Sequence, residues 1–147
     1  MESPTPPQTD DPAATAARCP ERIFLTGYMG AGKSTIGRLL AKRIGYRFYD
    51  TDALMIKGFS KPISRIFKEN GEASFRKAED QVIHELATRR KGFVASTGGG
   101  TLVREETMGP ALAHGTVIYL RAPIEMLFER VVFSPKDRPI LSEPDTE

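Results

Sequence analysis

The sequence lacks the features that mark secreted, membrane-spanning and zinc-binding proteins. Its single cysteine, Cys19, cannot form a disulfide within the chain. No apolar run approaches the roughly 20 residues that span a bilayer, and no basic stretch followed by an apolar one stands at the N-terminus as in a secretory signal. The two histidines have no second histidine or cysteine at metal-ligand spacing. We therefore expect a cytoplasmic enzyme or binding module.

The sequence also has little net charge. Its 21 lysine and arginine residues nearly balance its 19 aspartate and glutamate residues, which leaves a formal charge of +2. This charge is too small to indicate nucleic acid as a partner. The one basic cluster, Arg89-Arg90-Lys91, lies where a helix is predicted to end, and cations are favourable near that end of the helix dipole. We interpret the cluster as a solvated helix end.

The N-terminal segment has no large aliphatic or aromatic residue apart from Met1. Residues 1–20 hold five of the eleven prolines, and such a segment cannot bury enough apolar surface to offset the entropy lost on ordering. We predict a disordered leader over 1–20, one folded domain over 21–141 and an unstructured tail over 142–147.

Short apolar stretches alternate with helical periodicity from residue 21 onward. Strands are predicted at 23–25, 46–49, 93–96 and 116–120, and helices at 33–44, 63–69, 72–88, 105–113 and after Pro123. The predicted apolar faces are Ile36, Leu39, Leu40 and Ile44 on the first helix, and Phe75, Val82, Ile83 and Leu86 on the helix 72–88. This alternation predicts an α/β fold with a parallel sheet and helices on both faces. In such sheets ligands bind beyond the carboxyl ends of the strands.

A glycine-rich motif follows the first predicted strand directly. Residues 27–35 read GYMGAGKST and fit the phosphate-binding pattern G-x-x-x-x-G-K-[ST]. Glycines let several backbone N–H groups converge on phosphate oxygens, and the following helix directs its positive end at them. The alternative is a flexible turn before a lysine, but the strand–loop–helix context favours a phosphate site. We predict that the nucleotide is bound by Gly30, Ala31, Gly32, Lys33, Ser34 and Thr35, with Ser34 on Mg²⁺.

Two carboxylates, Asp50 and Asp52, stand where the second predicted strand ends. In an extended strand, residues i and i+2 point the same way and lie about 6–7 Å apart, which suits two neighbouring partners. Taken alone, the stretch fits a helix start better, with Asp50 or Thr51 as N-cap. Beside a phosphate loop, one carboxylate can hold magnesium through water and the other can orient an acceptor hydroxyl, as phosphoryl transfer requires.

Three further stretches carry polar or glycine residues that suit a ligand site. Arg76 begins the long predicted helix, although it also fits a surface arginine paired with Glu72 and Asp80. Three glycines at 98–100 allow a ligand to approach the backbone closely, although they also fit an ordinary loop. Residues 134–141, SPKDRPIL, fit either a surface loop or a mobile lid that brings Arg138 onto transferring phosphates.

In combination these stretches closely resemble the shikimate kinase family. That family shows the phosphate loop, then F-x-D-[ST]-D, then G-E-x-x-F-R-x-x-E, then a triple glycine after the third strand, and a lid ending R-P-L-L or similar. The matching residues here are 48–52, 71–79, 98–100 and 138–141, in the same order. The resemblance covers residues 22–141.

The resemblance implies a fold, a reaction and roles for single residues. The fold is of the nucleoside-monophosphate-kinase type, with a five-stranded parallel sheet in the order 2-3-1-4-5. The reaction is phosphorylation of the 3-hydroxyl of shikimate by ATP with Mg²⁺, carried out by a monomer in the cytoplasm. Asp52 would accept a hydrogen bond from the attacking hydroxyl, and Asp50 would stand in the magnesium shell with Ser34. Arg76 would hold the shikimate carboxylate, the backbone of Gly98, Gly99 and Gly100 would meet the ring hydroxyls, and Arg138 would close over the nucleotide phosphates with catalytic Lys33.

The sequence departs from the family's pattern after the lid. Family members usually continue with a helix that carries a second arginine for the shikimate carboxylate, then a fifth strand and an adenine-contacting loop. From their absence we expect an exposed apolar edge on the strand at 116–120 and weaker substrate binding. A fragment, a truncated gene product and part of a split protein all stay open as explanations.

Two other functions also stay open. The first is a related kinase of the same fold that acts on gluconate or a nucleoside monophosphate. The second is a non-catalytic nucleotide-binding module, which would bind ATP tightly without releasing ADP on addition of shikimate. The combination of Asp50 and Asp52 with Arg76 and the triple glycine favours shikimate as the substrate.

Overall fold

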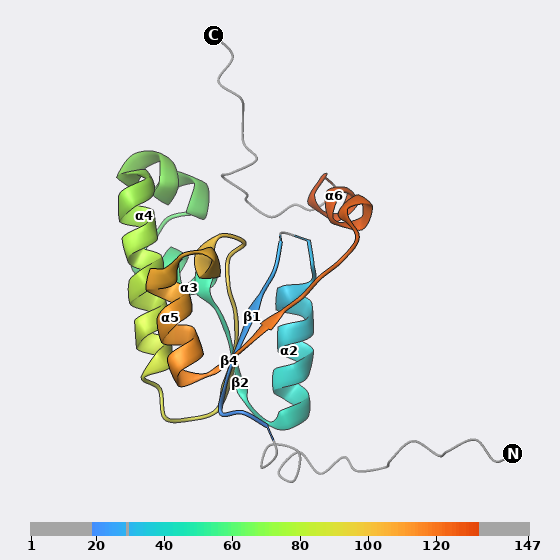
Figure 1. Cartoon of the computed structure of the whole chain (residues 1–147). Coiled ribbons are helices and arrows are strands. Elements are labelled where there is room, and N and C mark those ends of the chain that lie inside the picture. The colour runs from blue at the N-terminus through green and yellow to red at the C-terminus, as the bar shows by residue number, and fades with distance from the viewer. Residues whose placement is uncertain (1–18, 29, 133–147) are drawn as a thin grey trace, which may run out of the picture.

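The computed structural model describes residues 19–28 and 30–132 as one α/β unit (Figure 1). Its four strands are β1 (Arg22–Thr26), β2 (Arg47–Asp50), β3 (Phe93–Ser96) and β4 (Thr116–Tyr119). Its helices are α2 (Lys33–Ile44), α3 (Thr51–Phe59), α4 (Ile63–Ala87), the short 3₁₀ helix η1 (Thr101–Val103), α5 (Glu105–His114) and α6 (Ile124–Val132). Each predicted strand and helix is therefore present, with ends that differ by at most one residue, whereas α3 and η1 were not among the predicted elements.

The strands form one parallel sheet in the order β2-β3-β1-β4. This order confirms the predicted parallel sheet and agrees with 2-3-1-4 of the expected order. The register places the residues at the ends of β2 and β3 side by side, since Asp50 is paired with Ser96. Figure 1 shows α2 on one side of the sheet and α4 and α5 on the other, so both faces are covered by helices.

Alternate side chains of β1 enter two separate cores, as a strand buried on both faces requires. Ile23 and Leu25 pack with α2 residues such as Ala41, whereas Phe24 packs with Ile83 and other residues of α4 and α5. A third cluster joins α3 to α4. The sheet is thereby fixed between two helical layers, and the loops at its carboxyl edge start from immobile strand ends.

The predicted apolar face of α2 is partly wrong. Ile44 is buried, but Ile36 and Leu39 are 43% and 65% exposed. The side of α2 that meets the sheet carries Gly37 instead. A β-carbon on Gly37 would lie 2.6 Å from the ring of Phe48 in β2, so a larger side chain would not fit there. The smallest residue marks the closest approach of this helix to the sheet, and hydrophobicity alone could not show this.

The long helix α4 is two helices joined at Gly71. The backbone of Gly71 has a positive φ of 81° together with an extended ψ of 164°. The prediction of separate helices at 63–69 and 72–88 is therefore confirmed, and the predicted stripe with Phe75, Ile83 and Leu86 is buried. Glycine is suited to this junction because it adopts positive φ without steric cost.

Two predictions concern the borders of the domain. Cys19 packs against the core beside α2, and its carbonyl accepts a hydrogen bond from the Tyr46 hydroxyl at 3.4 Å. Cys19, which lies inside the predicted leader 1–20, is therefore in contact with the folded part. The rest of that leader, the lid at 134–141 with Arg138, and the tail 142–147 lie outside the described residues.

The strand β4 has the exposed apolar edge that the sequence predicts. Within the described residues β4 pairs only with β1, and its Ile118 and Tyr119 are 38% and 55% exposed. The helix that follows it also shows apolar side chains to solvent, since Ile124 is 75% and Phe128 is 68% exposed. Among the described residues, no helix has both the length and the apolar character needed to cross a membrane.

Candidate active site

Glycines with positive φ bend the phosphate loop between β1 and α2. Gly27, Gly30 and Gly32 have φ values of 146°, 81° and 89°. At Gly27 a β-carbon would also lie 2.4 Å from the carbonyl oxygen of Leu120, at the end of β4. Gly32 is the N-cap of α2, and no described side chain caps this helix end. The first N–H groups of α2 are therefore placed for phosphate oxygens.

Lys33, the first residue of α2, extends back over the loop. Its Nζ donates hydrogen bonds to the carbonyl oxygens of Gly27 at 2.6 Å and Tyr28 at 3.1 Å. The ammonium group thus lies against the segment that would surround the phosphates. A lysine ammonium is a compact charge on a flexible stem, so it can exchange these carbonyls for phosphate oxygens.

The hydroxyl of Ser34 joins the phosphate loop to the ends of two strands. Ser34 Oγ donates a hydrogen bond to Asp50 Oδ2 at 3.2 Å and lies 3.2 Å from Ser96 Oγ. The three groups come from α2, β2 and β3, and all carry hard oxygen donors. Such donors suit Mg²⁺, which usually keeps several waters and takes one or two carboxylates from the protein. The predicted pairing of Ser34 with Asp50 therefore fits a magnesium–nucleotide complex.

Asp50 also has the capping role that the sequence offered as the alternative. Its Oδ1 accepts hydrogen bonds from the backbone N–H groups of Asp52 at 2.9 Å and Ala53 at 3.3 Å, at the N-terminus of α3. Capping and metal binding are compatible because each uses a different carboxylate oxygen. Asp50 is thus an N-cap and a candidate magnesium ligand at once.

Asp52 does not continue the strand, so the extended geometry considered for the pair is wrong. It lies in the first turn of α3, and its carboxylate is directed to the glycine loop after β3. A β-carbon at Gly98 would lie 3.1 Å from Asp52 Oδ1. The side chain is half-buried. The predicted acceptor-side carboxylate and the first glycine of the triple glycine therefore lie in contact range.

Arg76 meets the same glycine loop from α4. A β-carbon at Gly100 would lie 3.1 Å from Arg76 Nη1. The guanidinium group donates from Nη1 to both carboxylate oxygens of Glu79, at 3.0 and 3.1 Å. Its Nε lies 3.9 Å from Glu72, as the surface interpretation suggested, but Asp80 pairs with a different residue. Arg76 is therefore oriented by Glu79, a residue that the sequence alone did not single out.

Arg104 is the second partner of Glu79. Its Nη2 lies 3.4 Å from Glu79 and 2.6 Å from Asp80, and it also donates to the carbonyl oxygen of Arg76. Burial has the largest single effect on the pKa of Arg104 and lowers it. The hydrogen bond and charge of Asp80, together with the charge of Glu79, outweigh burial, so the pKa is raised overall. Arg104 therefore stays charged. Because Glu79 faces two cations, it does not by itself cancel the charge of Arg76.

The other predicted site residues are placed less directly. Ala31 is buried in the phosphate loop, Thr35 is exposed on α2, and Gly99 is half-buried between the two glycines that face Asp52 and Arg76. Arg138 lies outside the described residues. Ser96 and Glu79 are site residues that the sequence analysis missed. For Glu79 the signal was present, since the motif G-E-x-x-F-R-x-x-E ends on it.

Comparison with known proteins identifies the family. A family model described as shikimate kinase matches residues 29–147. A curated shikimate kinase of Azobacteroides pseudotrichonymphae is 41% identical over 126 residues, which are 86% of this chain and 74% of that protein. Across the curated relatives considered, the chain spans between 63% and 74% of their length.

Solved structures agree with the sequence relatives. Shikimate kinase from Acinetobacter baumannii, in complex with shikimate, superposes with a TM-score of 0.78 at 37% identity, covering 84% of this chain and 68% of that one. A gluconokinase from Sinorhizobium meliloti reaches 0.51 at 20% identity, over 78% of this chain and 65% of that one, which shows only a shared fold. Shikimate kinases are transferases that use ATP with Mg²⁺. The chain belongs to the shikimate kinase family.

Proposed function

We propose that this chain transfers the γ-phosphoryl group of ATP to the 3-hydroxyl of shikimate, giving shikimate 3-phosphate and ADP. One observation supports this most directly. The glycine loop after β3 contacts a carboxylate from α3, Asp52, and a guanidinium from α4, Arg76. A hydroxylated carboxylic acid needs both groups, one for its reacting hydroxyl and one for its carboxylate. The Ser34–Asp50 pair lies at the same edge of the sheet.

The nucleotide side of the site is assigned to the phosphate loop and its neighbours. Bound magnesium–ATP supplies the phosphoryl group, and the metal offsets the negative charge that develops on it. Backbone N–H groups from Gly30 to Thr35 and the Nζ of Lys33 hold the phosphates. Ser34 Oγ and Asp50 Oδ2 would hold the metal, directly or through water. Arg138 closes over the phosphates from the lid and excludes water.

The acceptor side is assigned to Asp52, Arg76 and the triple glycine. Asp52 accepts the hydrogen bond of the 3-hydroxyl and takes its proton as the oxygen bonds to phosphorus. Arg76, held by Glu79, binds the substrate carboxylate through its planar fork. The backbone of Gly98, Gly99 and Gly100 meets the other ring hydroxyls. Orientation of the reacting oxygen by several fixed groups is the main contribution a protein makes to phosphoryl transfer.

A coupled assay of ADP release tests the proposal against its alternatives. Shikimate, gluconate and nucleoside monophosphates are compared with ATP and Mg²⁺, on this chain and on any longer native form. We expect ADP release when shikimate is the acceptor, and none when gluconate or a nucleoside monophosphate takes its place. Faster release with gluconate or a nucleoside monophosphate would show a related kinase. ATP binding without release in any mixture would show a non-catalytic nucleotide-binding module.

The variant Arg76→Ala tests the substrate side. We expect the KM for shikimate to rise about 10- to 100-fold, because a charge-assisted contact to the substrate carboxylate is worth about 1.5–3 kcal/mol. The affinity for ATP should change little, since Arg76 contacts the glycine loop and Glu79 rather than the phosphate loop. Steady-state kinetics with each substrate varied in turn measures both. Equal losses for shikimate and ATP would indicate a structural role instead.

We further propose that the enzyme acts as a monomer in the cytoplasm, with a small molecule as its only acceptor. The small net charge supports the absence of a nucleic-acid partner. Light scattering coupled to size-exclusion chromatography measures the mass directly. A mass of twice 16.2 kDa at micromolar concentration would contradict the monomer.

A further inference from the structure

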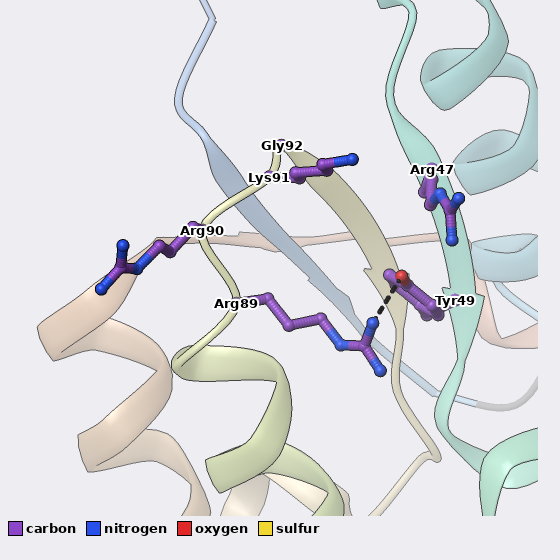
Figure 2. A pocket seen from close by; sticks show the side chains of 6 residues that line it. All are labelled: Arg47, Tyr49, Arg89, Arg90, Lys91 and Gly92. Atoms are coloured by element: carbon purple, nitrogen blue, oxygen red, sulfur yellow. Dashed lines mark hydrogen bonds between the residues drawn. The ribbon is translucent and has the colours of Figure 1, made fainter.

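A basic pocket lies at the end of the sheet opposite the candidate active site. Its volume is about 220 Å³, and it is lined by Arg47, Tyr49, Arg89, Arg90, Lys91 and Gly92 (Figure 2). Arg47 and Gly92 stand at the starts of β2 and β3, whereas the candidate active site lies at their carboxyl ends. Asp50 is three residue steps along β2 from Arg47, about 10 Å at 3.3 Å per residue. The pocket is therefore separate from the phosphate loop.

Three of the four cations in this pocket surround one tyrosine. Arg47 and Tyr49 project from the same face of β2, being two residues apart in a strand. Figure 2 shows Arg89 reaching toward Tyr49, and Lys91 and Arg47 on the open side above it. The guanidinium end of Arg90 is directed away from this group. The pocket thus combines three converging cations with one phenol.

Arg89 is held in place before any ligand binds. Its Nη1 donates to the Tyr49 hydroxyl at 2.9 Å, and its guanidinium lies 4.6 Å from the centre of the Tyr49 ring. Its backbone carbonyl accepts a hydrogen bond from Arg22 Nε at 2.8 Å. The loop is also close to β2 at Gly92, where a β-carbon would lie 2.6 Å from the ring of Tyr46. A cation fixed in this way loses less entropy on binding an anion.

Carboxylates do not neutralise these cations in the part of the chain that the structure describes. None of its ion pairs includes Arg47, Arg89 or Lys91, although the exposed Arg65 and the half-buried Lys61 both pair with Glu69. The helix dipole accounts for Arg89 and Arg90, which follow the end of α4. It does not account for Arg47, which comes from a neighbouring strand. Three exposed cations around one pocket, without a carboxylate partner among the described residues, give it a positive potential that attracts an anion.

From this arrangement we infer that the pocket of Arg47, Arg89 and Lys91 binds a compact phosphate-bearing anion of high charge, of the pyrophosphate type. Two arginine forks and an ammonium match several phosphate oxygens at short range. The Tyr49 hydroxyl accepts from Arg89 and can itself donate to a further phosphate oxygen. The small volume favours one or two phosphate groups over a long polymer.

Amide NMR of the ¹⁵N-labelled full chain tests this inference without any kinetic assay. Pyrophosphate and glycerol 3-phosphate are titrated separately at constant ionic strength, with chloride as the reference. We expect saturable shifts of the Lys91, Gly92 and Tyr49 amides, with pyrophosphate binding tighter. Tighter binding of glycerol 3-phosphate at these amides would overturn the inference of a pyrophosphate-type anion and assign the site to a phosphate monoester. Shifts of amides in the phosphate loop would report binding at the candidate active site. Binding at the basic pocket and binding at the active site are therefore measured separately, and either can fail without the other.

Two matched variants separate a built site from general electrostatic attraction. Arg47→Gln and Arg90→Gln each remove one exposed positive charge, but only Arg47 faces Tyr49. We expect Arg47→Gln to weaken pyrophosphate binding at these amides about tenfold, and Arg90→Gln to weaken it less than about twofold. Equal losses, or shifts that rise without saturation, would overturn the inference. Tighter binding of a glutamate-rich peptide at the same amides would overturn it in favour of a protein partner.

Discussion

Asp52→Asn is expected to lower kcat by about 10²- to 10⁴-fold, the range that general-base catalysis contributes. The asparagine keeps the shape of the side chain and its position in the first turn of α3, but it cannot take the proton of the acceptor hydroxyl. The affinity for ATP should change less than about twofold, because the asparagine keeps the shape of the side chain and the proposed role of Asp52, which lies near Gly98, is on the acceptor side. Coupled ADP release gives kcat, and calorimetric titration gives the ATP affinity.

A matched control distinguishes this effect from a change in net charge. Glu85→Gln makes the same replacement of a carboxylate by an amide at an exposed residue near the C-terminus of α4. This variant should leave kcat unchanged. Turnover of Asp52→Asn equal to that of the parent chain would remove Asp52 from the mechanism. A parallel loss of ATP affinity would place its role in nucleotide binding instead.

Glu79→Ala is expected to lower the free energy of unfolding by about 3 kcal/mol, near the lower end of the range for breaking a buried ion pair. The side chain of Glu79 is only 3% exposed and accepts hydrogen bonds from Arg76, Arg104 and Thr101. Its removal leaves two guanidinium groups without their shared partner. Because Arg76 and Arg104 are 21% and 27% exposed, water compensates part of the loss. Urea unfolding followed by circular dichroism measures the difference.

Glu72 provides the control for this prediction. It also faces Arg76 on α4, but at 3.9 Å and with a side chain that is 69% exposed. An exposed pair of this kind contributes about 0–1 kcal/mol, so Glu72→Ala should change the free energy of unfolding by less than about 0.5 kcal/mol. If both variants had the same stability, burial of Glu79 would contribute nothing, and the positioning of Arg76 would need another explanation.

Much of the fold and half of the site could be predicted because they depend on local patterns. Short apolar stretches between helical segments predicted all four described strands. The spacing of glycines before Lys33 predicted the loop between β1 and α2 as a phosphate loop. Ser34 and Asp50, predicted to share a magnesium ion, are 16 residues apart and joined by a hydrogen bond, and their metal role stays a prediction. These features depend on residues close in sequence or on the general rule that ligands lie at the carboxyl edge of a parallel sheet.

The parts that could not be predicted depend on contacts distant in sequence. Ile36 and Leu39 have the character of core residues, yet α2 approaches the sheet through Gly37. The helix start at Asp50 is different, since this cap is local and the sequence offered it as the alternative to an extended pair. The contact of Arg104 with Glu79 joins residues 25 positions apart. No local pattern specifies which buried acid meets which cation.

The double use of Asp50 has a mechanical consequence for the enzyme. One oxygen of this carboxylate sets the direction of the helix that carries Asp52, and the other adjoins Ser34. Under the roles proposed above, a cation at the second oxygen would act on the same rigid carboxylate that caps α3. Binding on the nucleotide side would then be transmitted through Asp50 to the helix that carries Asp52.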